Sequence, residues 1–207
     1  MAKEILVVSR DILFRGKEFQ GFVKTGDNDF VETIISNYAY KERALVENDA
    51  NLKQPIPYIW LINPKTKKIF IYKRNLGKGD YKETRHFHNY SGGVGGHIDR
   101  DTEEKSPNPI QDAMMRELKE EITMQNYPVP KIIGFINSEI DTFNSVHFGI
   151  IGIAETTENA KPTDDGIAEG DFYSAEEIEK LFSNPSNKVE NWTKLSWPFV
   201  KEYISKL

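Results

Sequence analysis

The sequence predicts an α/β (α+β) fold built around a mixed β-sheet. Two observations favour this class. Short apolar runs typical of strands alternate along the chain with segments whose apolar residues recur at helical spacing. The 207 residues, of which 38% are hydrophobic and 29% charged, are typical of a soluble globular protein with a substantial core. We expect residues 1–50 to form an N-terminal elaboration packed on a main domain of residues 51–207, giving a single compact unit.

Strands are predicted where apolar runs are bounded by polar or turn-forming residues. They cover residues 5–9, 56–62, 68–72, 131–136 and 146–154. Residues 63–66 (Asn-Pro-Lys-Thr) connect the second and third runs in the manner of a hairpin turn. Residues 47–54 are interpreted as a polar connection, and residues 161–170, rich in Asp and Gly, as a loop.

Helices are predicted where apolar side chains fall three or four positions apart. They cover residues 30–40, 109–123, a segment opening at Ser174, and 190–207. Asp29 is a candidate N-cap of the first helix, and Ser174 with Glu177 has the pattern of a capping box. The last helix is expected to break near Pro198, because proline removes a backbone hydrogen bond.

Composition excludes several classes of function. The formal net charge of −5 provides no general basic field, so nucleic acid is not expected as a partner. The absence of cysteine excludes disulfides, thiolate metal sites and cysteine nucleophiles, and it suits a reducing compartment. No apolar segment is long enough to cross a membrane, and the first apolar run is too short for a signal peptide. The expected location is the cytoplasm.

Three carboxylates gather on the helix predicted at residues 109–123. Glu117, Glu120 and Glu121 lie within an arc of about 100°, next to the apolar arc of the same helix. Like charges at this spacing repel, and a divalent cation with oxygen ligands, above all Mg²⁺, relieves the repulsion. The alternative is an acidic helix face that is merely solvated.

A glycine run, residues 92–96, precedes this helix. It is neither a Rossmann fingerprint nor a P-loop, because Ile98 occupies the position of the last glycine and no Gly-Lys-Ser/Thr follows. Gly92 and Gly93 are compatible with a simple flexible turn. Gly95 and Gly96, placed just before the carboxylates, could instead bring backbone close to a ligand.

Gly95-Gly96, followed at residues 113–121 by Ala-x-x-Arg-Glu-Leu-x-Glu-Glu, resembles the Nudix box. Residues 172–178 also resemble the strand-to-helix segment that follows the box in Nudix domains, and residues 95–98 and 146–149 resemble a bacterial branch of predicted phosphoesterases. The box covers about an eighth of the chain. The resemblance implies a Nudix-type α/β/α sandwich with a mixed β-sheet.

The sequence departs from the box at three points. The spacing from Gly96 to Arg116 is about six residues longer than in the family, and Thr123 replaces the closing glycine. Asn108 stands where the family has glutamate; it can cap the helix, but a charged role would need Glu103 or Glu104 to fold back.

The resemblance implies metal-dependent hydrolysis of a diphosphate linkage in a nucleoside diphosphate derivative or similar small phosphorylated substrate. Mg²⁺ is the expected metal, with Mn²⁺ as an alternative. The implied metal ligands are the Gly96 carbonyl and the side chains of Glu117, Glu120 and Glu121, while Arg116 orients a glutamate. The catalytic base is left open between Glu117 and Glu169, with Glu139 and Asp141 as further candidates.

The substrate-binding candidates are cationic, polar or aromatic residues near strand ends or the glycine run, namely Arg74, Lys53, Gln54, Tyr58, His97 and His147. His86 and His88 could place two imidazoles on one side of a strand, but a structural role is favoured over zinc binding. Residues 65–85 are basic, and a solvated hairpin is favoured over RNA contact.

Two alternatives remain. A non-catalytic, nucleotide-binding module of the same fold is motivated by Asn108 and the longer spacing. An enzyme resembling isopentenyl-diphosphate isomerase is disfavoured, because the cysteine used in that chemistry is absent. By analogy with Nudix proteins, a homodimer is a further expectation.

Overall fold

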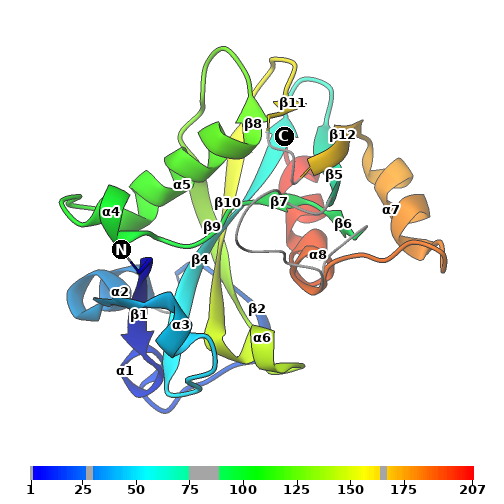
Figure 1. Cartoon of the computed structure of the whole chain (residues 1–207). Helices are drawn as coiled ribbons and strands as arrows, with labels where there is room; N and C mark the ends of the chain where they lie inside the picture. The colour runs from blue at the N-terminus through cyan, green and yellow to red at the C-terminus, as the bar shows by residue number, and fades with distance from the viewer. Residues whose placement is uncertain (1, 27–29, 75–88, 164–166) are drawn as a thin grey trace. The chain divides into compact units, whose positions relative to one another are not determined.

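The computed structural model describes residues 2–26, 30–74, 89–163 and 167–207 (Figure 1). Its helices and strands confirm the predicted mixed α/β class. The chain divides into two compact units, called the first and second unit below. The first unit comprises Met1–Tyr58, Gly95–Met114 and Ile132–Gly152, and the second comprises Ile59–Val94, Met115–Lys131 and Ile153–Leu207. The division of the chain at residue 50 stays a prediction.

Four elements contribute residues to both units, and each was predicted from its apolar pattern. They are β4 (Leu52–Asn63), α5 (Pro109–Glu121), β9 (Lys131–Asn137) and β10 (His147–Glu155). Helix α5 begins as predicted, because Oδ1 of Asn108 accepts from the backbone N of Gln111 at 3.1 Å. It ends at Glu121, two residues earlier than predicted, where β8 (Ile122–Thr123) follows.

The first unit contains mostly short elements. They are β1 (Glu4–Ser9), α1 (Arg10–Phe14), β2 (Gly21–Lys24), α2 (Phe30–Asn37), β3 (Ala39–Glu42), α3 (Arg43–Val46), α4 (Arg100–Glu103) and α6 (Thr142–Val146). Strand β1 pairs antiparallel with β3 and with the start of β4, and β2 pairs antiparallel with β9. The predicted strand at residues 5–9 is thus confirmed. The helix predicted at residues 30–40 is present but ends at Asn37, because residues 39–40 belong to β3. Asp29 lies outside the described residues.

A cluster of phenylalanine rings forms the core of the first unit. Its members come from α1, α2, β9, β10 and the connection before β2, and they are Phe14, Phe19, Phe30, Phe135 and Phe148. Neighbouring ring centroids lie between 5.1 Å (Phe30 to Phe135) and 6.2 Å (Phe14 to Phe30). Edge-to-face pairs of this kind each add about 0.5–1.5 kcal/mol beyond their burial. The cluster therefore fixes the ends of the strands that carry the polar residues discussed below.

The start of β4 differs from the prediction. Residues 47–54 were expected to form a polar connection, yet β4 begins at Leu52. Lys53 and Gln54 are both fully buried in the strand. The polar sequence around Lys53 and Gln54 suggested that both side chains are exposed. Each of them has polar partners inside the unit, which allows its burial.

The second unit combines a sheet with two long helices. Its elements are β5 (Lys68–Arg74), β6 (Tyr90–Ser91), β7 (Gly93–Val94), β8, β11 (Lys161–Pro162), β12 (Ile167–Tyr173), α7 (Ala175–Ser183) and α8 (Asn191–Ser205). Strand β5 pairs antiparallel with β4, β6 and β12. The predicted hairpin is confirmed, and Oδ1 of Asn63 caps its turn by accepting from the backbone N of Lys65 and of Thr66, each at 3.1 Å. The capping box of Ser174 and Glu177 is also present.

Two predictions in this unit are wrong. Residues 161–170 are not one loop, because Lys161–Pro162 pairs with β8 and β12 begins at Ile167 and pairs with β5. Helix α8 also does not break at Pro198. Its buried face packs against Trp60: the rings of Trp60 and Trp197 stack at 6.1 Å, and Nε1 of Trp60 donates to Oγ of Ser196 at 3.1 Å. This packing outweighs the cost of proline in a helix, about 3 kcal/mol.

Candidate functional site

One guanidinium bridges two of the predicted metal-binding glutamates on α5. Nη1 of Arg116 donates to Oε1 of Glu117 at 2.7 Å and to Oε2 of Glu120 at 3.0 Å. Glu117 is buried, Glu121 is half-buried, and the side chain of Glu120 is 57% exposed. Glu117 and Glu120, three positions apart, therefore share the guanidinium of Arg116. That Arg116 orients a glutamate for a metal ion stays a prediction.

The donor chemistry of this helix suits a divalent cation. One arginine balances one of three neighbouring negative charges, and oxygen-only donors are those that Mg²⁺ prefers. However, within the part of the chain that the structure describes, no group of three or more His, Asp or Glu side chains is arranged to hold a metal ion. The convergence of Glu117, Glu120 and Glu121 on one ion, and the role of the Gly96 carbonyl, stay predictions.

The glycine run is shaped by close packing. Gly95 has φ +148°, and a Cβ there would lie 2.0 Å from the carbonyl O of Pro57. Gly92 is not the flexible turn that was considered: it lies directly after β6, and a Cβ would lie 2.2 Å from the ring of Trp60. Both positions need glycine because backbone or an indole ring occupies the space of a side chain.

The insertion before α5 does not supply a substitute for the missing glutamate at position 108. Glu103 is buried, and its Oε2 accepts from the backbone N of Asp99, the residue before α4, at 2.7 Å. Glu104 is exposed, and its Oε1 accepts from Nη2 of Arg100 at 2.6 Å. Both acids thus have local structural partners within the inserted segment.

The candidate bases beyond α5 lie in different settings. Glu169 is exposed on strand β12, opposite Lys73 of β5, and not on the loop where it was expected. Asp141 caps α6 by accepting from the backbone N of Asn144 at 2.7 Å. Glu139 is held in an ion-pair network described below. A catalytic role for any of the three stays a prediction.

Two of the predicted substrate contacts are engaged within the protein. Arg74 pairs through Nε with the buried carboxylate of Glu190, which also accepts from Oγ of Ser91 at 2.7 Å. The guanidinium of Arg74 lies 5.4 Å from the ring centroid of Tyr72. Tyr58 is only 4% exposed. Their roles in binding phosphate or a base stay predictions.

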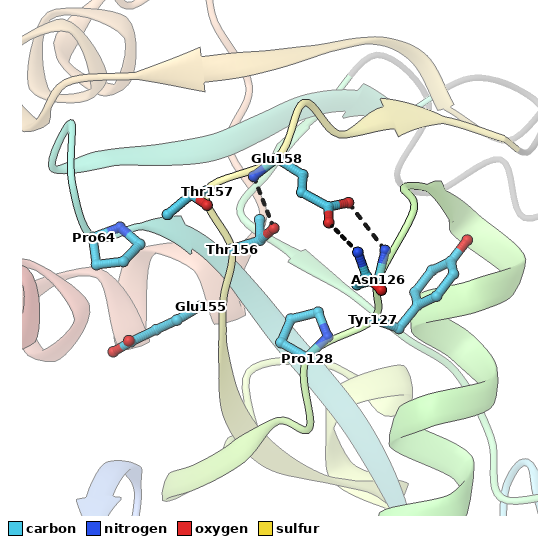
Figure 2. A pocket seen from close by; sticks show the side chains of 8 residues that line it. All are labelled: Pro64, Asn126, Tyr127, Pro128, Glu155, Thr156, Thr157 and Glu158. Carbon is cyan, nitrogen blue, oxygen red and sulfur yellow. Dashed lines mark hydrogen bonds between the residues drawn. The ribbon is translucent and has the colours of Figure 1, made fainter.

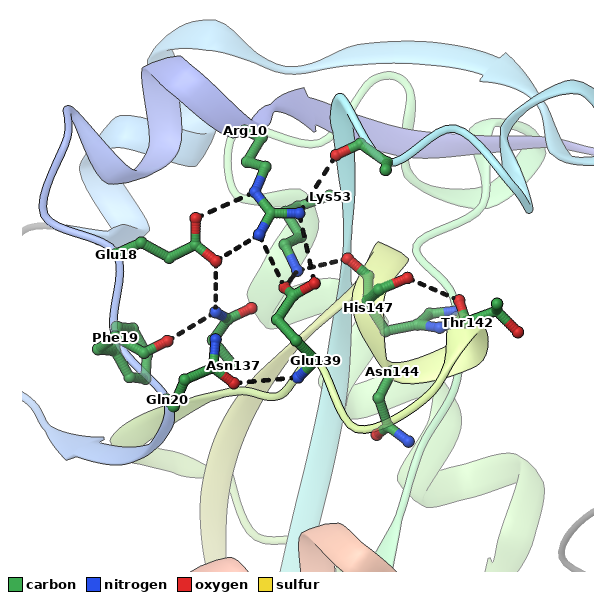
Figure 3. A network of polar contacts seen from close by, with 12 residues as sticks. Arg10, Glu18, Phe19, Gln20, Lys53, Asn137, Glu139, Thr142, Asn144 and His147 are labelled. Atoms are coloured by element: carbon green, nitrogen blue, oxygen red, sulfur yellow. Dashed lines mark hydrogen bonds and ion pairs between the residues drawn. The ribbon is translucent and has the colours of Figure 1, made fainter.

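Charged side chains gather around Lys53 in the first unit (Figure 3). Its buried Nζ donates to Oε1 of Glu139 at 2.8 Å and to the carbonyl O of Ser145 at 2.5 Å. Arg10 approaches the same Oε1 of Glu139 at 3.0 Å and also pairs with Glu18. Burial lowers the pKa of Lys53, and its hydrogen bond to Glu139 opposes that effect. Two cations and two carboxylates balance one another, so a phosphate would have to compete with Glu139 for Lys53.

Two histidines and a glutamine form a second polar cluster in the first unit. Nε2 of His97 lies 2.9 Å from Oε1 of Gln54 and 3.3 Å from Nε2 of His147. Nδ1 of His147 lies 2.6 Å from the carbonyl O of Phe143, whose ring lies against the imidazole with a centroid distance of 4.1 Å and the planes tilted by 38°. Gln54 is oriented by its Nε2, which donates to the carbonyl O of Val46 at 3.1 Å. The sequence predicted these residues one by one, and the structure brings three of them together.

Arg10, Glu18 and Asn137 were not predicted. Nδ2 of Asn137 donates to the carbonyl O of Phe19 at 2.7 Å and to Oε1 of Glu18 at 3.3 Å, which joins β9 to the segment before β2. The partners are separated by more than a hundred positions along the chain, so no local pattern indicates the network. His86 and His88 lie outside the described residues.

A shallow hollow lies in the second unit, and none of the predicted site residues is among those that line it (Figure 2). Prolines, threonines, a tyrosine, an asparagine and two acids line it: Pro64, Asn126, Tyr127, Pro128, Glu155, Thr156, Thr157 and Glu158. Oε2 of Glu158 accepts from the backbone N of Gln125 and of Asn126, and Nδ2 of Asn126 donates to its Oε1 at 2.6 Å. These bonds hold the connection between β8 and β9 and leave little of that carboxylate for a ligand.

Comparisons with known proteins identify the fold. No family model matches the sequence. Protein YmaB of Bacillus subtilis is 29% identical over 213 aligned positions, which cover 93% of this chain and 95% of YmaB. The crystal structure of Tm1382, a candidate Nudix hydrolase, superposes with a TM-score of 0.75 and 24% identity over 99% of this chain and 100% of that one.

Two more distant structures agree. The bifunctional NMN adenylyltransferase/ADP-ribose pyrophosphatase of Francisella tularensis has a TM-score of 0.51 and 12% identity over 73% of this chain and 41% of that one. The Nudix domain of Shewanella oneidensis NrtR, in complex with ADP-ribose, has a TM-score of 0.53 and 9% identity over 74% and 88%. The chain therefore has the Nudix fold. Among its described helices, none combines the length and apolar character needed to cross a membrane.

Proposed function

We propose that this protein is a Nudix hydrolase that cleaves the diphosphate linkage of a nucleoside diphosphate derivative or a similar small phosphorylated compound in the presence of a divalent metal ion. The observation that carries the proposal is the arrangement on α5: Arg116 bridges Glu117 and Glu120, and Glu121 is the next residue on the same arc. The Nudix fold of the chain supports it.

The carboxylates of α5 would hold the metal ion, with Mg²⁺ as the first choice and Mn²⁺ as an alternative. Bound there, the ion would neutralise charge that develops on the phosphates during attack by water. Arg116 would hold Glu117 and Glu120 in their orientations, and the buried setting of Glu117 would favour a tightly bound cation over an exposed charge. Glu117 and Glu169 are both retained as candidates for the base.

The substrate class rests on chemistry and on the comparisons. Two proteins of the same fold are described with ADP-ribose, one as an ADP-ribose pyrophosphatase and one as a complex with that compound. ADP-ribose is therefore the first substrate to examine, beside other nucleoside diphosphate derivatives. We also propose that the protein acts in the cytoplasm, in keeping with the absence of cysteine.

The test measures products of a substrate panel by phosphorus NMR with Mg²⁺ or Mn²⁺, and again with EDTA. Glu120→Gln and Glu121→Gln should each reduce kcat by at least about a hundredfold, since each removes charge at the metal. Asp112→Asn, an exposed acid on the same helix, is the matched control and should keep full activity. Turnover that persists in EDTA, or in both glutamate variants, would contradict the proposal.

A second candidate, a nucleotide-binding module without turnover, is favoured by one observation. Neither Glu103 nor Glu104 replaces the glutamate missing at position 108, because each carboxylate accepts a hydrogen bond from a residue at the start of the inserted segment, Asp99 or Arg100. This candidate predicts calorimetric binding of ADP-ribose or a related nucleotide with no product in the NMR assay. A measurable kcat would exclude it.

A further inference from the structure

The His97–His147 pair has the geometry of two ligands to one transition-metal ion. Two imidazole nitrogens bound at about 2.0–2.1 Å to a tetrahedral ion lie about 3.3 Å apart. The two Nε2 atoms are 3.3 Å apart, with the ring centroids 5.4 Å apart and the ring planes at 63°, so the separation of the two nitrogens matches that expected for two ligands of one ion. A hydrogen bond between the rings can produce a similar distance, so the tautomers and the third donor matter.

The proton on His147 is placed by its partner. The carbonyl O of Phe143 can only accept, so Nδ1 of His147, at 2.6 Å, carries the proton and Nε2 presents its lone pair. Metal-binding histidines typically make this bond, donating the remaining N–H to a backbone carbonyl that fixes the ring. Contact with the tilted ring of Phe143, whose centroid lies 4.1 Å away, restricts the imidazole further.

Gln54 supplies a third donor. Its Nε2 must face the carbonyl O of Val46, because a carbonyl accepts and cannot donate, and this turns Oε1 toward His97. Gln54 is fully buried and His147 is 4% exposed, whereas His97 is half-buried and is the member of the cluster most exposed to solvent. Nε2 of His97 therefore lies 2.9 Å from one further donor atom, Oε1 of Gln54, and 3.3 Å from another, Nε2 of His147.

We propose that His97, His147 and Gln54 bind a borderline transition-metal ion such as Zn²⁺, with the remaining position filled by water or by an anionic oxygen. In the bound form His97 carries its proton on Nδ1 and binds through Nε2. The three donors are uncharged, so the ion keeps its positive charge and attracts an anion such as a phosphate. Imidazole donors select Zn²⁺, Cu²⁺, Ni²⁺ or Co²⁺ over Mg²⁺, which distinguishes this site from the carboxylates of α5 by metal preference.

The experiment is a calorimetric titration of the full chain with Zn²⁺ in millimolar Mg²⁺, which occupies oxygen-only sites. Visible absorption of Co²⁺ provides a second readout for nitrogen ligands. The wild-type protein should bind one equivalent. His97→Ala and His147→Phe should each weaken binding at least about tenfold, and Gln54→Leu should weaken it less, because imidazole is the stronger ligand.

The sequence offers a matched control. It has four histidines, and the other two, His86 and His88, are the pair that could also bind zinc. The double variant H86A/H88A should bind Zn²⁺ like the wild-type protein, and so should Glu120→Gln, whatever its effect on hydrolysis. The last result separates this site from the proposed function.

Three results would overturn the proposal: no binding of Zn²⁺ by the wild-type protein, wild-type affinity in both histidine variants, or loss of binding in H86A/H88A. Circular dichroism and thermal unfolding check that each variant folds. If the buried His147→Phe change prevents folding, the half-exposed His97→Ala change decides the question by itself.

Discussion

Nζ of Lys53 lies 2.8 Å from Oε1 of Glu139, in a pair whose two members differ sharply in burial. The lysine side chain is fully buried, whereas the glutamate side chain is 31% exposed. Glu139→Gln would leave an ammonium group inside the protein without its nearest counter-charge, and it should cost about 2–4 kcal/mol in the free energy of unfolding. Lys53→Met removes the buried charge itself and should cost only about 1 kcal/mol.

Urea unfolding of both single variants and of K53M/E139Q tests this asymmetry. The double variant should be about as stable as Lys53→Met, because the charge that makes Glu139→Gln costly is gone. If the two single variants lost equal amounts of stability, and if these losses added up in the double variant, the pair would not be coupled.

Lys53 also makes the free energy of unfolding depend on pH in the alkaline range. Burial lowers the pKa of Lys53 below its usual 10.5, so the folded protein loses this proton at a lower pH than the unfolded chain. Between those two pKa values the unfolded chain binds more protons, and stability contributed by this group therefore rises with pH.

Tyr203 acts in the opposite direction, because its hydrogen bond to Glu155, together with burial, raises its pKa to about 12. The folded protein keeps that proton longer, and stability falls as the pH passes from about 10 to 12. Chemical unfolding at a series of pH values should show a smaller alkaline rise in Lys53→Met than in wild type, and a smaller decline above pH 10 in Tyr203→Phe. Parallel curves for the variants and the wild type would contradict both assignments.

Gly95 should be among the least replaceable residues of the glycine run. Its φ is +148° and a Cβ would lie 2.0 Å from the carbonyl O of Pro57, so Gly95→Ala requires the backbone of β4 to move. We expect a loss of at least about 3 kcal/mol. Gly16→Ala is the matched control: φ is +74°, open space surrounds the position, and the cost should be about 1–2 kcal/mol. Thermal unfolding distinguishes the two variants. Equal losses of stability would mean that the backbone at Pro57 can move away from the added Cβ at little cost.

Local patterns sufficed for most elements but not for contacts between distant segments. Apolar periodicity identified α5 and β10, and Asn108 identified the start of α5. The first part of strand β12 was predicted as a loop, because its composition is that of a loop and its pairing with β5 joins residues about a hundred positions apart. The predicted break at Pro198 was wrong because the burial of Trp60 against α8 outweighs the low helix propensity of proline.

The candidate site shows the same limit. The period of an α-helix places Glu117, Glu120 and Glu121 on one arc, so their proximity to one another could be predicted from the sequence. Lys53 was predicted as a substrate contact, but its burial beside Glu139 depends on a partner 86 positions away. His97 and His147 were each singled out, whereas their contact across 50 positions could be found only in the structure.

The role of Asn108 can be separated into capping and charge. Its Oδ1 accepts from the backbone N of Gln111 at 3.1 Å, so Asn108→Ala should lower the free energy of unfolding by about 1 kcal/mol. Asn108→Asp keeps the cap and adds a negative charge at the helix N-terminus, so stability should match or slightly exceed that of the wild type. Urea unfolding measures both. A large loss in Asn108→Asp would indicate that nearby acids, such as Asp112, already saturate this helix end with negative charge.

Arg116 provides a test for a cation at α5 that does not depend on turnover. Its guanidinium contacts Oε1 of Glu117 and Oε2 of Glu120, so Arg116→Gln should destabilise the protein in EDTA by about 1–3 kcal/mol. If Mg²⁺ binds these carboxylates, it should restore part of that loss, because saturation at a hundred times the Kd adds about 2.7 kcal/mol.

The gain with Mg²⁺ should be larger in Arg116→Gln than in the wild type, where arginine already satisfies the same oxygens. Arg100→Gln is the control: Arg100 also joins two acids, Glu4 and Glu104, but on an exposed surface. It should cost less stability than Arg116→Gln and show no gain with Mg²⁺ beyond that of the wild type. Thermal unfolding with and without Mg²⁺ measures all three proteins, and a gain with Mg²⁺ in none of them would argue that the carboxylates of α5 hold no metal ion.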